Sequence, residues 1–341
     1  MIETEEIFMR RALELAALGL GTARPNPMVG AVIVHEGRII GEGYHHHPGE
    51  GHAEVMAVAS VRERHLLPES TLYVTLEPCA HYGKTPPCVE LILRERIPRV
   101  VVAMEDPFPA VSGRGIRRLR EEGGVEVSVG LLEEEARSLN AAFITAHTLH
   151  RPYVTLKWAQ SIDGYMDRVR SSRAESPEVF SSPLHQRIVH QVRLAHEAIL
   201  VGYRTALLDD PQLGNRLWYG PSPLRVILDP HLQLPQDLRV FTDSSCPTLV
   251  LHLSSVVAPS SQVEGRPHLR YRALEGTRLT PEAILSALYE GEGVQSLLVE
   301  GGAATLELFM AGGLYDEILL EVSPRALGKG VLAPSLGERR G

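Results

Sequence analysis

Short segments rich in β-branched residues alternate with amphipathic segments in the first half of the chain. The stretches STLYVTLEP and RVVVAMEDP have the composition of strands, and CVELILRERI between them has the apolar spacing typical of a helix. GIRRLREEGG and VEVSVGL continue the series as a helix and a strand. Because strands that alternate with helices form a sheet with helices on its faces, the sequence predicts an α/β fold.

The segments around this series predict further helices and a pair of strands. Residues 4–18 have a helical pattern, and the apolar segments that follow predict two strands around a turn at residues 35–38. A helix is expected at residues 53–63, and a long one over residues 133–147. The first half of the chain is therefore expected to form a complete α/β domain.

A second series of strands and helices begins near residue 150. A chain of 341 residues is more often two domains than one, so we expect domains of residues 1–147 and 148–341. The second domain is expected to have helices near residues 184–195, 280–290 and 303–311, and strands in EAILVG, PLRVILDP, CPTLVLHL, SLLVEGG and YDEILLEVSP.

Composition and charge limit the classes of partner. The formal net charge of -8 disfavours a nucleic acid, which is a polyanion. The acidic opening MIETEEIFMR lacks the apolar centre of a secretory signal, and no apolar run reaches the roughly 18 residues of a membrane span. Three cysteines are few for a secreted, disulfide-linked protein. We therefore expect a cytoplasmic protein that binds neither nucleic acid nor membrane.

Two of these cysteines, Cys79 and Cys88, lie in the stretch EPCAHYGKTPPC. His52 and Glu54 form an H-x-E motif at the start of an expected helix. One histidine and two cysteines are a ligand set of catalytic zinc, and a zinc deaminase also needs an acid that is not a ligand. The motif therefore favours zinc on His52, Cys79 and Cys88, with Glu54 as the proton carrier.

Three other interpretations of the cysteine pair stay open at this point. The thiols could be unpaired buried residues, or they could form a disulfide, which a reducing compartment disfavours. A structural zinc is the third interpretation, and His81 could be its fourth ligand. An H-x-E motif followed by a strand and P-C is specific enough to favour the catalytic metal.

The cytidine-deaminase-like superfamily commonly has P-C-x-x-C, whereas eight residues separate the two cysteines here. With this insert, and with PNPMVGAVIV, GEGYHHHPGEGHAE, YVTLEPC and EDPFPAVSGRGIRRLREEG, the chain closely resembles the bifunctional riboflavin-biosynthesis deaminase/reductase family. The resemblance implies an N-terminal cytidine-deaminase-like three-layer domain and a C-terminal dihydrofolate-reductase-like α/β domain. It also implies a homo-oligomer.

The resemblance further implies two reactions on a small phosphorylated pyrimidine. The first is the zinc-dependent hydrolytic deamination of 2,5-diamino-6-ribosylamino-4(3H)-pyrimidinone 5′-phosphate, with one zinc ion per chain. The second is the NADPH-dependent reduction of the ribosyl chain, which gives 5-amino-6-ribitylamino-uracil 5′-phosphate. In the first reaction, Glu54 is expected to take a proton from the attacking water and to deliver it to the departing ammonia.

By the same resemblance, Asn26, His81 and Lys84 contact the substrate of the deaminase. His81 is then a substrate contact and not a zinc ligand. An asparagine offers a donor and an acceptor to a pyrimidine edge, and a lysine offers a point charge to a phosphate. The histidines at residues 45–47 are expected to border this pocket.

The second half has no G-x-G-x-x-G motif, but Gly301 and Gly302 lie between an expected strand and an expected helix. Bare amides at a helix N-terminus bind phosphate, although such a turn is more often a plain connection. The resemblance places Arg193, Arg216 and Glu300 against the substrate. It implies that the cofactor is contacted by Lys157, Ala159, Thr205, Asp209, Gly302, Ala303, Ala304, Thr305, Leu306, Glu307 and Leu308.

Two departures from the family pattern fall in the second half. RSSRAESPEVFSSP replaces the usual Gly-Glu-Ser-x-Trp-Ile, so that Pro177 falls at the position of a substrate-binding serine and Val179 at that of the tryptophan. The chain also ends earlier than family members usually do, at ALGKGVLAPSLGERRG, and a final strand is expected to be missing. Both departures concern the reductase more than the deaminase.

Two other classes of protein fit parts of the sequence. A zinc deaminase of nucleosides or tRNA with a degenerate second domain would share the metal motif, but the acidic charge and the reductase-like second half disfavour it. A non-catalytic protein stabilised by zinc would need no acid two residues after a ligand, so Glu54 disfavours that class.

Overall fold

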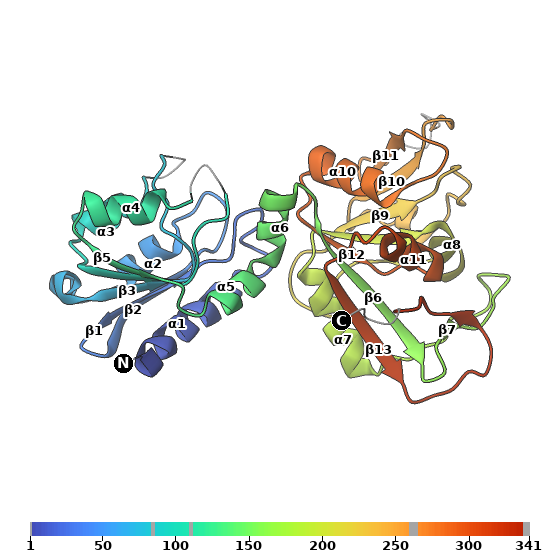
Figure 1. The fold of residues 1–341 in the computed structure, drawn as a ribbon. Helices are drawn as coiled ribbons and strands as arrows, with labels where there is room; N and C mark the ends of the chain where they lie inside the picture. Colours follow the sequence, from blue (N-terminus) through green and yellow to red (C-terminus); the bar gives the residue numbers. More distant parts are fainter. Residues whose placement is uncertain (1, 83–85, 109–111, 259–264, 337–341) are drawn as a thin grey trace. The chain divides into compact units, whose positions relative to one another are not determined.

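The computed structural model describes residues 2–82, 86–108, 112–258 and 265–336. The chain forms two compact units, residues 1–150 and 151–341, each with its own large sheet (Figure 1). The boundary expected between residues 147 and 148 falls inside the last helix of the first unit, α6 (Ala141–Leu149). Within the described ranges, no helix is both long and apolar enough to cross a membrane.

A five-stranded sheet with the order β2-β1-β3-β4-β5 forms the centre of the first unit. β1 is antiparallel to β2 and β3, whereas β3, β4 and β5 are parallel to one another. The parallel pairing places the carboxyl ends of these three strands at one edge of the sheet. All five strands were predicted, and their bounds are β1 (Gly30–His35), β2 (Arg38–Tyr44), β3 (Thr71–Val74), β4 (Arg99–Val102) and β5 (Glu126–Val129).

Helices cover both faces of this sheet (Figure 1). α1 and α5 share an apolar core with strand residues such as Val32, and α2, α3 and α4 share another with strand residues such as Ile33. Because successive side chains of a strand point to opposite faces, one sheet can bury two cores. The predicted three-layer domain is confirmed. The helices are α1 (Ile2–Ala17), α2 (Ala53–Ser60), α3 (Cys88–Arg94), α4 (Arg114–Glu121) and α5 (Glu133–Leu139), with a 3-10 turn at Arg64–Glu69.

The long helix predicted over residues 133–147 is in fact two helices, α5 and α6, which meet at Asn140. The buried Asn140 side chain pairs with the backbone of Met28: Oδ1 accepts from its N–H (2.8 Å) and Nδ2 donates to its carbonyl (2.9 Å). The helical pattern on both sides of Asn140 carries no sign of this contact, because its partner lies far away in the sequence.

The second unit is built on a seven-stranded sheet with the order β11-β10-β9-β8-β12-β6-β13, in which all neighbouring strands are parallel. A separate antiparallel pair joins β7 to β14. The strands are β6 (Tyr153–Ser161), β7 (Tyr165–Asp167), β8 (Ala198–Gly202), β9 (Leu224–Leu228), β10 (Thr248–Leu253), β11 (Leu269–Leu274), β12 (Ser296–Val299), β13 (Glu317–Ser323) and β14 (Val331–Leu332).

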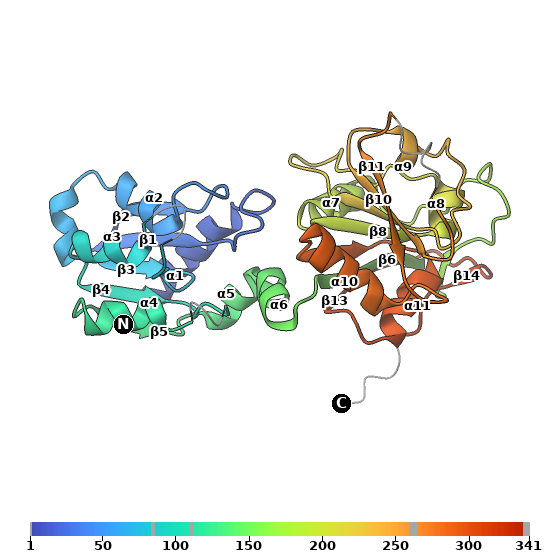
Figure 2. The same ribbon diagram turned by 90° about the horizontal axis from the view of Figure 1, so that it is seen from above.

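Helices lie on both faces of this sheet as well (Figure 2). α10 and α11 share a core with Val226 and Leu297, whereas α8 and α9 share a core with Ile227 and Leu298 on the other face. The predicted α/β class is therefore confirmed for both units. The helices are α7 (Pro183–Leu194), α8 (Tyr203–Asp209), α9 (Arg239–Thr242), α10 (Pro281–Glu292) and α11 (Ala303–Ala311).

Some elements of the second unit were not predicted, namely β7, β11, β14, α8 and α9. β11 has the sequence LRYRAL and lies at the edge of the sheet, where only its first and last residues are buried. An edge strand needs no continuous apolar run, so its pattern is weak. α9 has four residues, which is too short to show a helical period.

Candidate functional site

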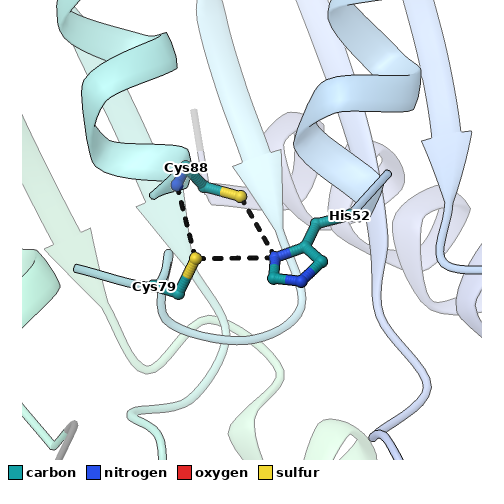
Figure 3. Close-up of side chains that lie close together, drawn as sticks. All are labelled: His52, Cys79 and Cys88. Atoms are coloured by element: carbon teal, nitrogen blue, oxygen red, sulfur yellow. Dashed lines mark hydrogen bonds between the residues drawn. The ribbon is translucent and has the colours of Figure 1, made fainter. Parts of the chain in front are cut away.

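Three ligand atoms meet beside the N-termini of two helices in the first unit (Figure 3). His52 directly precedes α2, Cys88 is the first residue of α3, and Cys79 lies in the loop after β3. His52 Nδ1 lies 3.5 Å from Cys79 Sγ and 3.3 Å from Cys88 Sγ, and all three ligand atoms lie within 4.8 Å of one another. The fold therefore brings together the three residues that the motif predicts as metal ligands.

These distances suit a zinc ion. Zn–S bonds of about 2.3 Å and Zn–N bonds of about 2.0–2.1 Å, at the tetrahedral angle, place a sulfur and a nitrogen about 3.6 Å apart. The two distances from His52 to the cysteines are close to this value. Among the described residues, no fourth histidine, cysteine or carboxylate joins the group, and three protein ligands are typical of a catalytic site rather than a structural one.

The pKa values of the two cysteine thiols are shifted in opposite directions. Hydrogen bonds from the Cys88 thiol and from His52 lower the pKa of Cys79 to about 4. The same contact with Cys79, together with burial, raises the pKa of Cys88. The Cys88 backbone N–H also donates to Cys79 Sγ at 3.3 Å. One thiolate is therefore favoured by the protein alone, and binding of a metal ion would require the second thiol to lose its proton as well.

Glu54 lies in the first turn of α2, two residues after His52, and only 3% of its surface is exposed. Burial raises the pKa of Glu54 to about 7, and the negative charge of Cys79 acts in the same direction. A carboxyl group that exchanges its proton near neutral pH suits a general acid–base role. The geometry thus places an acid of the predicted kind beside the ligand group.

Of the three consecutive histidines, His45 is the one that lies against the ligand group. It is 3% exposed, and its ring meets that of His52 edge-on with centroids 5.5 Å apart. His46 instead stacks on Tyr44 at 4.0 Å, and His47 is exposed. The expectation that residues 45–47 border the site is thereby narrowed to His45.

His45 also orients the side chain of Asn26. Its Nδ1 lies 3.3 Å from the Gly51 carbonyl oxygen, which can only accept, so Nδ1 carries the proton. The unprotonated Nε2 then accepts from Asn26 Nδ2 at 2.9 Å. No hydrogen bond to the carbonyl oxygen of Asn26 occurs among the described residues, so this oxygen can accept one from a ligand. Of the other two predicted contacts, His81 is exposed and Lys84 lies outside the described residues.

Glu77 is a buried acid that the motif did not single out. It is 4% exposed and lies two residues before Cys79, at the end of the predicted strand. Its position inside the conspicuous LEPC stretch is the signal that could have revealed it. Its carboxylate accepts hydrogen bonds at 2.8–3.3 Å from the backbone N–H groups of Asp106, Gly113, Gly115 and Ile116. These bonds tie the cysteine loop to the segment that enters α4.

In the second unit, a pocket of about 840 Å³ lies at the carboxyl ends of the central strands. Leu306 and Leu308, both predicted to face the cofactor, do not line it: Leu306 is fully buried in the apolar core, and Leu308 packs against that core. The predicted residues that line the pocket are Lys157, Ala159, Thr205, Asp209, Glu300, Gly302, Ala303, Ala304, Thr305 and Glu307.

The N-terminus of α11 forms part of this pocket. Gly302 precedes the helix, and its N–H donates to Thr205 Oγ1 at 2.9 Å. A Cβ at Gly301 would lie 2.6 Å from Thr305 Cβ, and one at Gly202 would lie 2.3 Å from Thr305 Oγ1. Glycine is therefore needed where the ends of β8 and β12 pass α11, and the helix presents its first amides to a ligand.

Asp209 lines the pocket and is paired with an arginine of the altered segment. The buried Arg170 forms ion pairs with Asp209 and with Asp167, the latter at 2.7 Å. Arg170 also donates to the carbonyls of Glu175 (3.2 Å) and Leu208 (3.1 Å). The charge of Asp209 is thus compensated by a residue of the segment that departs from the family pattern.

Glu178 links the altered segment, RSSRAESPEVFSSP, to the rest of the second unit by ion pairs. Its carboxylate pairs with Arg168 at 2.5 Å and with Arg325 at 2.6 Å, and its side chain is 9% exposed. Pro177 and Glu178 line the pocket, whereas Val179 is 58% exposed and does not. Ion pairs therefore hold the altered segment where an aromatic side chain was expected from the family pattern.

The predicted substrate contacts Arg193 and Glu300 are paired with each other. Arg193 Nε and Nη2 donate to the two oxygens of Glu300 at 3.2 and 2.7 Å, and Nη1 donates to the Gly214 carbonyl at 3.1 Å. Arg216 is exposed and has no carboxylate partner within the described ranges. The three residues are thus one salt-bridged pair and one separate cation.

Comparisons with known proteins agree with both units. A family model described as the cytidine and deoxycytidylate deaminase zinc-binding region matches residues 2–104, and one described as the RibD C-terminal domain matches residues 152–340. The deaminase fold and a zinc-binding region are therefore shown for the first unit, and a reductase-type domain for the second. The alternative of a deaminase with a degenerate second domain is not favoured.

Relatives match almost the whole chain. The riboflavin biosynthesis protein RibD of Aquifex aeolicus is 41% identical over 99% of this chain and 92% of its own length, and that of Escherichia coli is 36% identical over 95% and 89%. A solved Thermotoga maritima diaminohydroxyphosphoribosylaminopyrimidine deaminase/5-amino-6-(5-phosphoribosylamino)uracil reductase has 39% identity and a TM-score of 0.85, covering 97% of this chain and 90% of that one. The chain belongs to the RibD family of riboflavin biosynthesis proteins.

Proposed function

We propose that this chain is a bifunctional enzyme that deaminates 2,5-diamino-6-ribosylamino-4(3H)-pyrimidinone 5′-phosphate and then reduces the ribosyl chain of the product to a ribityl chain. The observation that carries the proposal is the group of His52, Cys79 and Cys88 with the buried acid Glu54 beside it. The second unit supplies a separate pocket with a helix N-terminus, which suits the second reaction.

In the deaminase, His52, Cys79 and Cys88 would hold one zinc ion per chain. Bound zinc would supply an activated water molecule. Glu54 would take the proton from the attacking water and deliver it to the departing ammonia. Asn26, oriented by His45, would accept a hydrogen bond from the pyrimidine, and His81 and Lys84 would complete the substrate contacts.

In the reductase, the pocket would hold NADPH. Bound NADPH would supply the hydride. The first amides of α11, beginning at Ala303, would bind its pyrophosphate, because a helix N-terminus attracts phosphate. Lys157 and Thr205, which also line the pocket, would contact the cofactor, with Thr205 beside the N-terminus of α11. Arg216, an exposed cation that is not among the residues lining this pocket, would bind the phosphate of the substrate. Glu300 would reach the substrate from the pocket wall while paired with Arg193.

The proposal also covers the cellular compartment and the self-association of the enzyme. All three cysteines are free thiols in the structure, which suits a reducing compartment, and we place the enzyme in the cytoplasm. We also infer that it self-associates, as its family resemblance implies.

The test is a paired assay on one preparation of the full chain. With the diamino substrate, zinc and NADPH, ammonia release and NADPH oxidation should both occur, and oxidation should lag behind ammonia. With already deaminated substrate, NADPH oxidation should begin at once. Ammonia release without NADPH oxidation on either substrate would contradict the reductase, and the reverse result would contradict the deaminase.

A further inference from the structure

One face of α7, together with Ser222, holds the backbone of residues 214–216. Arg193 donates to the Gly214 carbonyl at 3.1 Å, and His190, which is one helical turn earlier, accepts from the Arg216 backbone N–H at 3.1 Å through Nδ1. The two side chains point the same way because residues three apart on a helix share a face. Between these contacts, the Asn215 N–H donates to Ser222 Oγ at 2.9 Å. Every residue of the segment therefore has its backbone fixed.

His190 is built into this arrangement as an acceptor. It is 3% exposed, and it can accept at Nδ1 only if that nitrogen is unprotonated. Burial, followed by the positive charges of Arg193 and Arg216, lowers the pKa of His190 to about 4. The ring is thus held neutral at physiological pH, in the form that receives the Arg216 N–H.

Arg216 differs from Arg193 in what its guanidinium contacts. The three nitrogens of Arg193 are used by Glu300 and by the Gly214 carbonyl. Arg216 has no carboxylate within ion-pair distance among the described residues, and the charged groups that act on its pKa are the cations Arg193 and Arg239, which add to the effect of burial in lowering it. A cation whose charge is not compensated, on a fixed backbone, is suited to bind an anion.

We infer that His190 is a positioning residue for the reductase: it fixes the backbone of Arg216 so that the guanidinium meets the phosphate of the substrate. The inference rests on the proposed function of the second unit. His190 itself need not touch the substrate, the cofactor or the reacting atoms. Its contribution should therefore appear in the binding of the phosphorylated substrate, and it should depend on the presence of the Arg216 side chain.

The test compares two amide replacements in the full chain. In His190→Asn the side-chain oxygen can take the place of Nδ1 and accept from Arg216, whereas in His190→Gln the amide extends to the place of Nε2. His190→Gln should raise the KM for the deaminated phosphorylated substrate about tenfold, the value of one hydrogen bond at the strong end of its range. The KM for NADPH and kcat should change by less than about twofold, and His190→Asn should restore most of the substrate affinity.

A double-mutant cycle separates positioning from a merely structural role. In an Arg216→Ala background, His190→Gln should raise the substrate KM by less than about twofold further, because the side chain that it positions is gone. An equal rise in both backgrounds, an equal rise for NADPH, or an unchanged substrate KM in His190→Gln would overturn the role of His190. If the wild-type chain oxidises no NADPH with the deaminated substrate, both this role and the proposed reductase function are overturned.

Discussion

The two candidate sites manage charge in opposite ways. In the first unit, His52, Cys79 and Cys88 contact one another, and two thiols and an imidazole form a set of donors that a divalent metal ion would stabilise. In the second unit, acids and arginines around the pocket are already paired, as in Arg170 with Asp209 and Arg193 with Glu300. In the first site an added metal ion would balance the charge of the donor atoms, whereas in the second site the protein's own ion pairs balance the charges.

The largest expected effect tests the metal side of this comparison. Cys88→Ser removes a thiolate ligand, so the protein should lose most of its zinc by elemental analysis, and ammonia release should fall below detection. Cys246→Ser is the matched control, since Cys246 is also a buried free thiol but lies in the second unit. It should keep both zinc and ammonia release. Full zinc occupancy in Cys88→Ser would mean that the ligand set is wrong.

The next effect concerns the acid beside the ligands. Glu54→Gln keeps the shape of the side chain but cannot accept a proton, so deamination should fall by about 10²–10⁴-fold while zinc stays bound. With already deaminated substrate, the variant should oxidise NADPH at a rate close to that of the wild type. Zinc loss would make Glu54 a structural residue, and loss of the reductase would show that the two units do not act independently.

Arg216, which has no carboxylate partner among the described residues, gives a smaller effect. Arg216→Ala should raise the KM for the phosphorylated substrate about tenfold to a hundredfold, because a hydrogen bond to a charged group contributes about 1.5–3 kcal/mol. The KM for NADPH should hardly change. Steady-state kinetics with each ligand varied in turn measures both values, and an equal rise for the two would point to general misfolding.

Arg193, which is paired with Glu300, should behave differently from Arg216. Arg193→Ala leaves Glu300 largely buried without its partner, at 11% side-chain exposure, and breaking such a pair costs about 3 kcal/mol or more. Both tryptophans of the chain, Trp158 and Trp218, lie in the second unit, so their fluorescence during urea unfolding reports on that unit alone. The midpoint should fall in Arg193→Ala and stay near the wild-type value in Arg216→Ala. Equal midpoints would remove the distinction between the two arginines.

The two units also differ in how much of their structure and site could be predicted from the sequence. The strand and helix series of the first unit and its metal group follow from local patterns: His52 and Glu54 are two residues apart, and both cysteines lie in one short stretch. The break at Asn140 and the four bonds of Glu77 depend on partners far along the chain, so no local pattern could reveal them. Contacts of this kind are set by tertiary packing.

In the second unit, residue types alone were a weaker guide. Arg193 and Glu300 could be named from the family resemblance, but their pairing could not, because it joins α7 to the end of β12. The ion pair of Asp209 with Arg170 could not be predicted for the same reason, since Arg170 belongs to the segment that replaces the family's usual Gly-Glu-Ser-x-Trp-Ile. Leu306 was assigned to the cofactor although its helical position directs it into the core.

The smallest expected effect uses pH to test how firmly the second unit fixes its own charges. The folded protein lowers the pKa of His190 from 6.5 to about 4, so below pH 6.5 the unfolded chain binds a proton that the folded chain resists. The stability that the neutral ring contributes is complete above pH 6.5, declines as the pH falls, and is lost once the pH has passed about 4. The whole change is at most about 3 kcal/mol, at 1.36 kcal/mol per pKa unit.

The groups that face the ring are Arg193, Arg216 and Glu300, and Glu300 opposes the shift. Urea unfolding followed by tryptophan fluorescence at pH 7, 6, 5 and 4 should therefore show a steeper loss of stability in the wild type than in His190→Asn, which cannot titrate. Parallel curves for the two proteins would show that His190 is not held neutral by the fold, and that the second unit sets its electrostatics by the arginine pairs alone.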